Sequence, residues 1–140
     1  MNFASDNAYG AMPEIVAALG KANEGSQRSY GDDEYTQRVR ARLRDIFEHE
    51  VFVYPVVTGT AANALALATL VPPHGAILCH AESHIAVDEC GAPEFFTHGA
   101  KPITLEGARA KLTPDAIAHG LAHFQNGFVQ HAQPKPISLT

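Results

Sequence analysis

The sequence lacks most features that would assign it to a specialised class of protein. It contains only two cysteines in 140 residues, Cys79 and Cys90, which is too few for a disulfide framework and favours a reduced, cytoplasmic setting. No basic n-region or apolar h-region of a secretory signal is visible at the N-terminus, and prolines interrupt the longest apolar runs well below membrane-spanning length. The net charge is −5 and no basic run is present, which argues against nucleic acid or an anionic membrane as the main partner.

The composition is that of a globular domain with a core of its own. Hydrophobic residues make up 46% of the chain and charged residues 18%, which excludes disorder over the whole length. Internal repeats and low-complexity segments are absent.

Two amphipathic helices are predicted in the first third of the chain. Pro13 suits a first helical turn, an apolar stripe follows over residues 15–19, and Gly20 is a plausible stop. The second helix is expected over residues 34–49, with Asp32 or Asp33 as its cap and four arginines away from its apolar face. We interpret these arginines as a solvated face rather than a nucleic-acid patch.

A strand, a helix and a second strand are predicted in the middle of the chain. Residues 51–57 form an apolar run typical of a buried strand, and an Ala- and Leu-rich helix follows until Pro72 and Pro73 end it. Residues 76–80 are the second apolar run. This succession predicts a right-handed βαβ unit and therefore a parallel sheet.

The turn that opens this helix, Thr58-Gly59-Thr60, is a candidate anion site. Free backbone N–H groups at a helix N-terminus favour negative charge, and two threonine hydroxyls lie beside them. The turn is neither a Walker A loop, because no Gly-Lys-Ser/Thr follows, nor a dinucleotide fingerprint, because it holds a single glycine. A plain N-capped core helix remains the alternative.

The segment after the second strand is dense in ionisable groups and lies at the same carboxyl edge of the sheet, where ligands bind. With Ser83 as a cap, His84 and Asp88 share a helix face. A metal site built from His80, His84, Asp88 and Glu89 is one interpretation, structural histidines are another, and a flat His84 ring facing an aromatic ligand is a third. A thiol nucleophile at either cysteine lacks a clear partner.

Further along the chain, residues 95–100 and 101–105 are expected to be extended. A helix follows, with Thr113 as its cap and Pro114 at its first position. Residues 125–136 are expected to be a loop, and residues 136–140 the start of another buried strand.

Several motifs in order resemble the threonine aldolase and β-eliminating lyase family of pyridoxal-phosphate enzymes, with fold type I (aspartate aminotransferase-like), and most nearly its bacterial low-specificity L-threonine aldolases. The resemblance covers essentially the whole chain. It is carried by the following motifs: Ser5-Asp6-Asn7, Ser29-Tyr30-Gly31-Asp32-Asp33, Thr58-Gly59-Thr60-Ala61-Ala62-Asn63, and the segment from His80 through His84 to Phe96.

The resemblance implies an α/β fold: the N-terminal part of the large domain, mainly a parallel sheet with flanking helices. It implies an arm and first helix over about residues 1–50 and a cofactor-binding βαβ portion over about residues 51–140, without the small C-terminal domain.

The same resemblance implies a cofactor, roles for site residues and a reaction. Gly59 and Thr60 would hold the phosphate of pyridoxal 5'-phosphate, and His84 would stack on its ring and help to deprotonate the substrate hydroxyl. Ser5 would contact the substrate carboxylate, and Tyr30 would reach a neighbouring subunit of a homo-oligomer, a dimer of dimers in the intact enzyme. The reaction would cleave L-threonine or L-allo-threonine to glycine and an aldehyde. No metal is implied.

The sequence departs from the family at the covalent anchor of the cofactor. None of its four lysines, Lys21, Lys101, Lys111 and Lys135, follows a strand in a Ser/Thr-rich turn. The pyridine-nitrogen Asp and the carboxylate-binding Arg of the family are also not matched. We therefore expect the N-terminal portion of a longer enzyme, inactive on its own. A truncated or pseudo-enzyme subunit, or a non-catalytic phosphate-binding α/β module, is the alternative.

Overall fold

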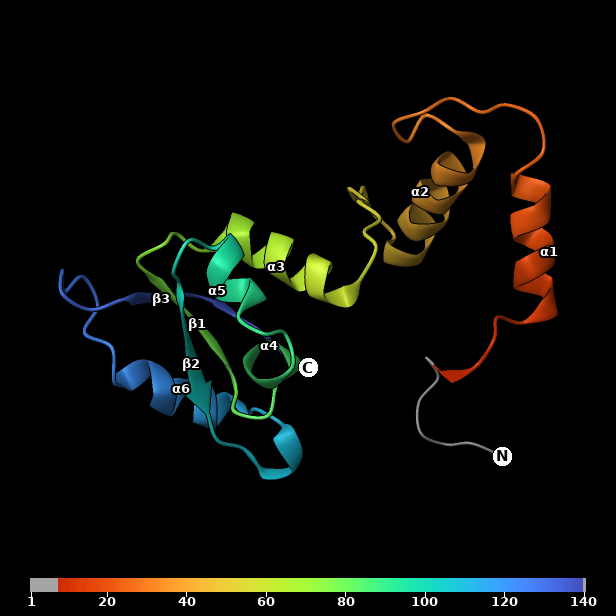
Figure 1. The fold of residues 1–140 in the computed structure, drawn as a ribbon. Helices are drawn as coiled ribbons and strands as arrows, with labels where there is room; N and C mark the ends of the chain where they lie inside the picture. The colour runs from red at the N-terminus through yellow and green to blue at the C-terminus, as the bar shows by residue number, and fades with distance from the viewer. Residues whose placement is uncertain (1–7, 140) are drawn as a thin grey trace. The chain divides into compact units, whose positions relative to one another are not determined.

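The computed structural model describes residues 8–139 and divides the chain into two compact units, residues 1–54 and 55–140. Ser5, the predicted contact of the substrate carboxylate, lies outside the described residues. No helix in the described part combines the length and the apolarity needed to cross a membrane. Each unit is taken by itself below (Figure 1).

The first unit contains two helices, α1 (Pro13–Ala22) and α2 (Glu34–Phe47), at the predicted places. Asp33 caps α2: its carboxylate accepts the Thr36 N–H at 2.8 Å and the Thr36 hydroxyl at 2.7 Å. These two bonds, the hydroxyl first, lower the pKa of Asp33 because they favour its charged form. Neither helix buries a residue, so their apolar stripes, including Leu19 and Ile46, are exposed in this unit.

The second unit is built on a parallel sheet of three strands in the order β2-β1-β3. Strand β1 (Gly75–His80) is central and wholly buried, which agrees with its apolar sequence. Strand β2 (Lys101–Leu105) pairs with it from Ala76 opposite Lys101 to His80 opposite Leu105. Strand β3 (Gln133–Ile137) pairs on the other side, with a register shift between Ala76 and Leu78.

Helices lie on both sides of this sheet (Figure 1). Helix α3 (Gly59–Leu70) packs against α5 (Ala92–Phe96), and the short α4 (His84–Val87) follows β1. Helix α6 (Pro114–Ala122), capped by Thr113, packs on β2, where buried Gly120 lies against Leu105. A 3₁₀ helix (Ala108–Ala110) joins β2 to α6.

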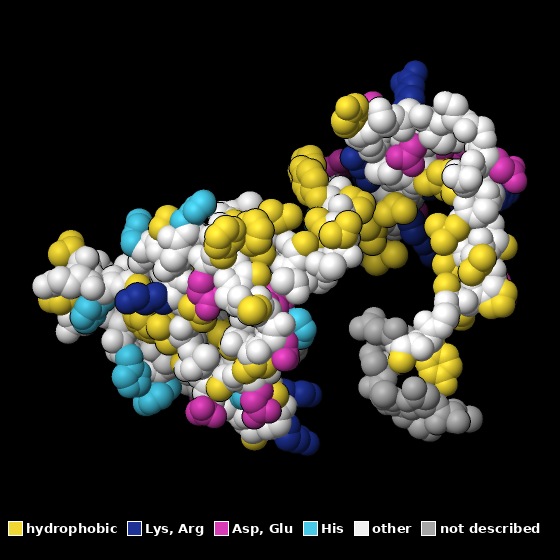
Figure 2. All heavy atoms as spheres, in the orientation of Figure 1, with side chains coloured by type: hydrophobic (Ala, Val, Ile, Leu, Met, Phe, Trp, Pro, Cys, Tyr) yellow, Lys and Arg dark blue, Asp and Glu magenta, His cyan; other side chains and the backbone are white. Residues whose placement is uncertain are grey.

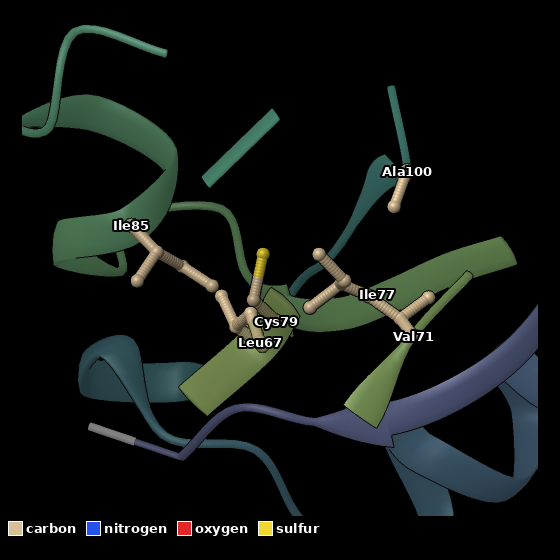
Figure 3. Close-up of a cluster of buried hydrophobic side chains, with 6 residues drawn as sticks. All are labelled: Leu67, Val71, Ile77, Cys79, Ile85 and Ala100. Carbon is tan, nitrogen blue, oxygen red and sulfur yellow. The ribbon is translucent and has the colours of Figure 1, made fainter. Parts of the chain in front are cut away.

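The core of the second unit lies between β1 and the helices on one side of the sheet (Figure 3). Ile77 and Cys79 alternate along β1 and point to the same face, as the two-residue period of a strand requires. The cluster consists of Leu67, Val71, Ile77, Cys79, Ile85 and Ala100. This core therefore fixes both α3 and α4 against the strand that ends at His80.

The predicted buried strand over residues 51–57 is wrong: this segment has no strand structure. Phe52 and Val57 are 82% and 96% exposed. A strand needs a hydrogen-bonded neighbour, and within the described residues this segment pairs with none of β1, β2 and β3. Pro55 also lacks an N–H to donate. The predicted βαβ unit with residues 51–57 as its first strand is therefore not formed. A parallel sheet is confirmed, but its strands are β1, β2 and β3.

Two further boundaries differ from prediction. The extended segment predicted over residues 95–100 is not formed: Phe95 and Phe96 end α5, and turns follow. Gly91, in the left-handed conformation, precedes this helix, and its carbonyl accepts the Phe95 N–H at 3.0 Å. Strand β3 begins at Gln133, inside the predicted loop. Its two prolines are compatible with its position at the edge of the sheet in the described structure.

Candidate functional site

The first turn of α3 presents two backbone N–H groups without a partner. Thr58 is the N-cap: its hydroxyl accepts the Ala61 N–H at 3.1 Å, and its carbonyl accepts the Ala62 N–H at 3.1 Å. Within residues 8–139, nothing accepts from the N–H groups of Gly59 and Thr60. A Cβ built on Gly59 meets no atom within 4 Å, so the space in front of the turn is open. This arrangement suits an anion.

His84 is the first residue of α4 and is held from one side. Its Nδ1 lies 2.8 Å from Oε1 of Glu89. The Glu89 side chain is fully buried, whereas the His84 side chain is 54% exposed. The imidazole therefore has one edge fixed by a buried carboxylate and the rest of the ring open to a ligand.

Glu89 also joins His84 to helix α3. The side-chain amide of Asn63, on the second turn of α3, donates to the same Oε1 of Glu89 at 2.7 Å. One oxygen atom of Glu89 thus connects the second turn of α3, through Asn63, with the ring of His84 at the start of α4. The helix that begins at Gly59 and Thr60 is therefore tied to the carboxylate that holds His84.

Sequence reasoning missed this role of Asn63 and Glu89 and placed Asp88 on the His84 face instead. Helix α4 ends at Val87 and Asp88 is its exposed C-cap with non-helical backbone, and within the described residues the His84 ring bonds to Glu89 rather than to the Asp88 carboxylate. The contact between Asn63 and Glu89 spans 26 residues. A local sequence pattern cannot predict a contact between residues so far apart in the chain.

His80 is a structural histidine in this fold. It is buried, its Nδ1 accepts the Glu82 N–H at 2.9 Å, and its Nε2 donates to the Gly107 carbonyl at 3.0 Å. Both ring nitrogens are thereby used within the chain. Across the described residues, no group of three or more His, Cys, Asp or Glu side chains is placed to hold a metal ion.

The other candidate residues take no part in these hydrogen bonds. Tyr30 belongs to the first unit, has a left-handed backbone (φ 61°) and a fully exposed side chain. Burial raises the pKa of the Cys79 thiol, which lies in the core. Lys101, Lys111 and Lys135 are exposed residues of the second unit, and Lys21 lies in the last turn of α1.

Apolar side chains are exposed on the same unit. Figure 2 shows hydrophobic side chains gathered over α3 and α5 on one face. The large exposed residues of these two helices are Leu65, Leu70, Phe95 and Phe96.

The fold is that of an α/β protein with a parallel sheet, in which a helix with free N-terminal N–H groups is tied through Glu89 to a histidine. The chain belongs to the β-eliminating lyase family, whose model matches residues 2–140. This confirms the predicted family.

Two bacterial relatives are similar over almost the entire chain. Low-specificity L-threonine aldolases of Pseudomonas sp. (strain NCIMB 10558) and Pseudomonas aeruginosa are each 41% identical over 138 residues, or 99% of this chain. The chain spans 39% of the length of each of them.

A solved structure of a Leishmania major threonine aldolase has the same fold. It superposes with a TM-score of 0.84 at 23% identity, over 93% of this chain and 37% of that one. The predicted α/β fold of the type I class is thereby confirmed.

Proposed function

We propose that this chain contributes the phosphate-binding turn and the ring-stacking histidine of a pyridoxal-5'-phosphate lyase. The reaction is the cleavage of β-hydroxy-α-amino acids, such as L-threonine and L-allo-threonine, to glycine and an aldehyde. The observation that carries the proposal is the link from α3 to His84 through Glu89, in a helix whose first N–H groups, those of Gly59 and Thr60, are unpaired. The names of the two Pseudomonas relatives support the substrate class.

The turn of α3 fits a phosphate group. Its two unpaired N–H groups and the Thr60 hydroxyl are donors, the helix dipole favours a dianion there, and open space lies in front of Gly59. The Thr58 hydroxyl already accepts the Ala61 N–H, so Thr58 holds the turn in shape rather than binding the ligand.

His84 fits the ring of the cofactor. Its imidazole is more than half exposed and held at Nδ1, so that a flat face is available for stacking. When bound, pyridoxal phosphate supplies an electron sink for the bond that breaks at Cα. The chain's own residues bind the phosphate, orient the ring and provide a proton acceptor for the substrate hydroxyl.

Two residues complete the proposed assignment from the family motifs. Ser5 would contact the substrate carboxylate. Tyr30 would serve the site of a neighbouring subunit in a homo-oligomer, for which its exposed side chain is suited.

Binding of pyridoxamine 5'-phosphate, compared with pyridoxamine, tests the phosphate site. The amine form cannot react with surface lysines, so equilibrium dialysis reports the non-covalent site alone. We expect the 140-residue chain to bind the phosphorylated ligand more tightly, and Gly59→Pro to reduce this preference. Proline is well tolerated at the first helical position, and Thr58 is already extended (φ −145°, ψ 159°), so the helix is preserved while one N–H is removed.

Loss of one hydrogen bond to a charged group costs about 1.5–3 kcal/mol, and about 1.4 kcal/mol corresponds to a tenfold change in affinity. We therefore expect binding to weaken about tenfold or more. Gly59→Ala is the matched control because it keeps the N–H. Equal binding of the two ligands by the unaltered chain would refute the phosphate site, and equal binding of inorganic phosphate would favour a general phosphate module.

A further inference from the structure

We propose that Glu89 is a positioning residue that holds neutral His84 in its Nδ1–H tautomer and leaves Nε2 as the free proton acceptor. The catalytic role of this tautomer depends on the function proposed above. The tautomer itself is a property of this chain and can be measured without any cofactor.

The hydrogen bonds around Glu89 determine where the histidine proton lies. A carboxylate only accepts hydrogen bonds, so the His84 Nδ1 that lies 2.8 Å from Oε1 must carry the proton. Asn63 donates to the same oxygen at 2.7 Å and anchors the carboxylate from α3. Glu89 is therefore prevented from turning away from the histidine.

Burial makes this constraint effective. The Glu89 side chain is fully buried, so water does not compete for the bond, and a buried carboxylate that lost His84 would keep only the neutral Asn63 as a partner. The Nδ1 edge faces this buried oxygen, whereas the His84 side chain as a whole is 54% exposed. The open edge of the ring is then the one that carries Nε2.

The consequence for chemistry is a histidine with one defined acceptor. When Nε2 takes the proton of a substrate hydroxyl, the O–H bond breaks, an N–H bond forms, and the oxygen keeps the electron pair. The imidazolium that results retains its Nδ1–H bond to Glu89, whose negative charge offsets the new positive charge. Glu89 acts through His84 and does not itself contact the substrate.

His80 provides an internal contrast in the same chain. Its Nδ1 accepts from the Glu82 N–H and its Nε2 donates to the Gly107 carbonyl, so His80 carries its proton on Nε2. The two histidines, four residues apart, are predicted by their partners to be opposite tautomers.

Long-range ¹H–¹⁵N correlation spectra of the uniformly ¹⁵N-labelled chain, at a pH where histidine is neutral, measure both tautomers. His84→Gln and His80→Gln assign the two rings. We expect Nδ1 of His84 and Nε2 of His80 to show shifts of protonated nitrogens. A predominantly Nε2–H form of His84 in the unaltered chain would overturn the proposal, whatever the behaviour of the variants.

Glu89→Leu removes the acceptor at similar volume, and we expect His84 to lose its Nδ1–H preference while His80 keeps its own form. Asn63→Ala is the matched control: it removes a donor to Glu89 but leaves the acceptor, and we expect His84 to remain Nδ1–H. Retention of the Nδ1–H form in a folded Glu89→Leu chain would contradict the proposal. Because no cofactor is present, a failure here is separate from a failure of pyridoxamine-phosphate binding.

Discussion

Asn63 on α3 donates a hydrogen bond of 2.7 Å to the carboxylate of Glu89, 26 residues later in the chain. The bond ties the helix that opens with the Gly59 turn to the segment that follows His84. The Glu89 oxygen that accepts this bond, Oε1, is also the atom that lies against Nδ1 of His84. The position of the histidine relative to α3 therefore depends on a side chain that is itself fully buried.

Replacing the donor in this pair by an acceptor should destabilise the fold strongly. Asn63→Asp sets a second carboxylate against buried Glu89, so that a hydrogen bond is exchanged for repulsion between like charges. We expect the free energy of unfolding at pH 7 to fall by about 3 kcal/mol. Urea unfolding followed by circular dichroism measures the change.

Asn63→Ala is the control, because it removes the donor without adding a charge. Its free energy of unfolding should fall by less than that of Asn63→Asp. The deficit of Asn63→Asp should shrink as the pH is lowered, because a protonated Asp can again donate to Glu89. A deficit that is independent of pH would contradict the proposed repulsion.

The Asp33 cap of α2 should make the first helices sensitive to acid. The Thr36 hydroxyl and N–H lower the pKa of Asp33 below its ordinary value of 3.8 in the folded chain. The charged cap then stabilises α2 above this unfolded value, and this contribution is lost as the pH falls through the lower folded value. Helix content measured by circular dichroism between neutral and acid pH should show the loss.

Asp33→Ala should remove that part of the acid response, and it should reduce helix content at neutral pH. Thr36→Ser keeps the hydroxyl and serves as the matched control, with a response close to that of the unaltered chain. An acid response of equal size in Asp33→Ala would assign it to other carboxylates.

Gly107 should tolerate no side chain, because of its close approach to the backbone of Lys111. An added Cβ would overlap the Lys111 carbonyl, with the carbonyl carbon at 2.9 Å. Gly107→Ala must therefore displace the loop after β2, including the carbonyl that His80 binds. We expect a loss of about 1–3 kcal/mol in unfolding free energy, as for overpacked sites.

Gly59→Ala is the natural comparison for this glycine, since a Cβ there meets no atom within 4 Å. Its urea midpoint should stay close to that of the unaltered chain. A similar loss in both variants would indicate a general effect of replacing glycine rather than the specific overlap at Lys111.

The two cysteines should differ sharply in reactivity. Cys79 is buried and burial raises the pKa of its thiol above the ordinary value of 9.0, whereas Cys90 is exposed. In Cys90→Ser we expect Cys79 to be alkylated by iodoacetamide only as fast as the unit unfolds, and in Cys79→Ala we expect rapid labelling of Cys90. Mass spectrometry over time distinguishes the two.

The raised pKa of Cys79 also predicts how the free energy of unfolding changes at alkaline pH. A thiol whose folded pKa is raised holds its proton more tightly in the folded chain, so its contribution is complete below the unfolded value and is lost as the pH rises beyond it. Cys79→Ala should abolish this part of the alkaline loss. Rapid labelling of Cys79 in the folded Cys90→Ser chain would contradict its burial.

Local sequence signals predicted most of the elements correctly. Thr58 and Thr113 cap helices where a hydroxyl precedes an apolar stretch, and each accepts the N–H three residues on. Residues 76–80 were predicted to be a buried strand from their apolar run, and β1 includes all of them. Such features depend on neighbours within one turn or one strand, and this is why a single sequence contains enough information to find them.

The segment 51–57 shows the limit of that reasoning. Its apolar run is as strong as that of β1, but strand formation requires a partner, and partner choice is decided by the order of the strands rather than by the run itself. The extended prediction for Phe95 failed similarly, because Gly91 precedes a short helix with Pro93 and Glu94 in its first turn, where both residue types are favoured.

The sequence by itself determined the capped helices, strand β1 and the Gly59-Thr60 turn, because short-range hydrogen bonding and periodicity specify them. Its ordered motifs also pointed to the family that the chain belongs to. Only the tertiary structure decided that Glu89, rather than Asp88, holds His84, and that Asn63 anchors Glu89. The physical reason is that α4 ends after one turn, and the buried carboxylate takes its partners from whichever elements pack around it.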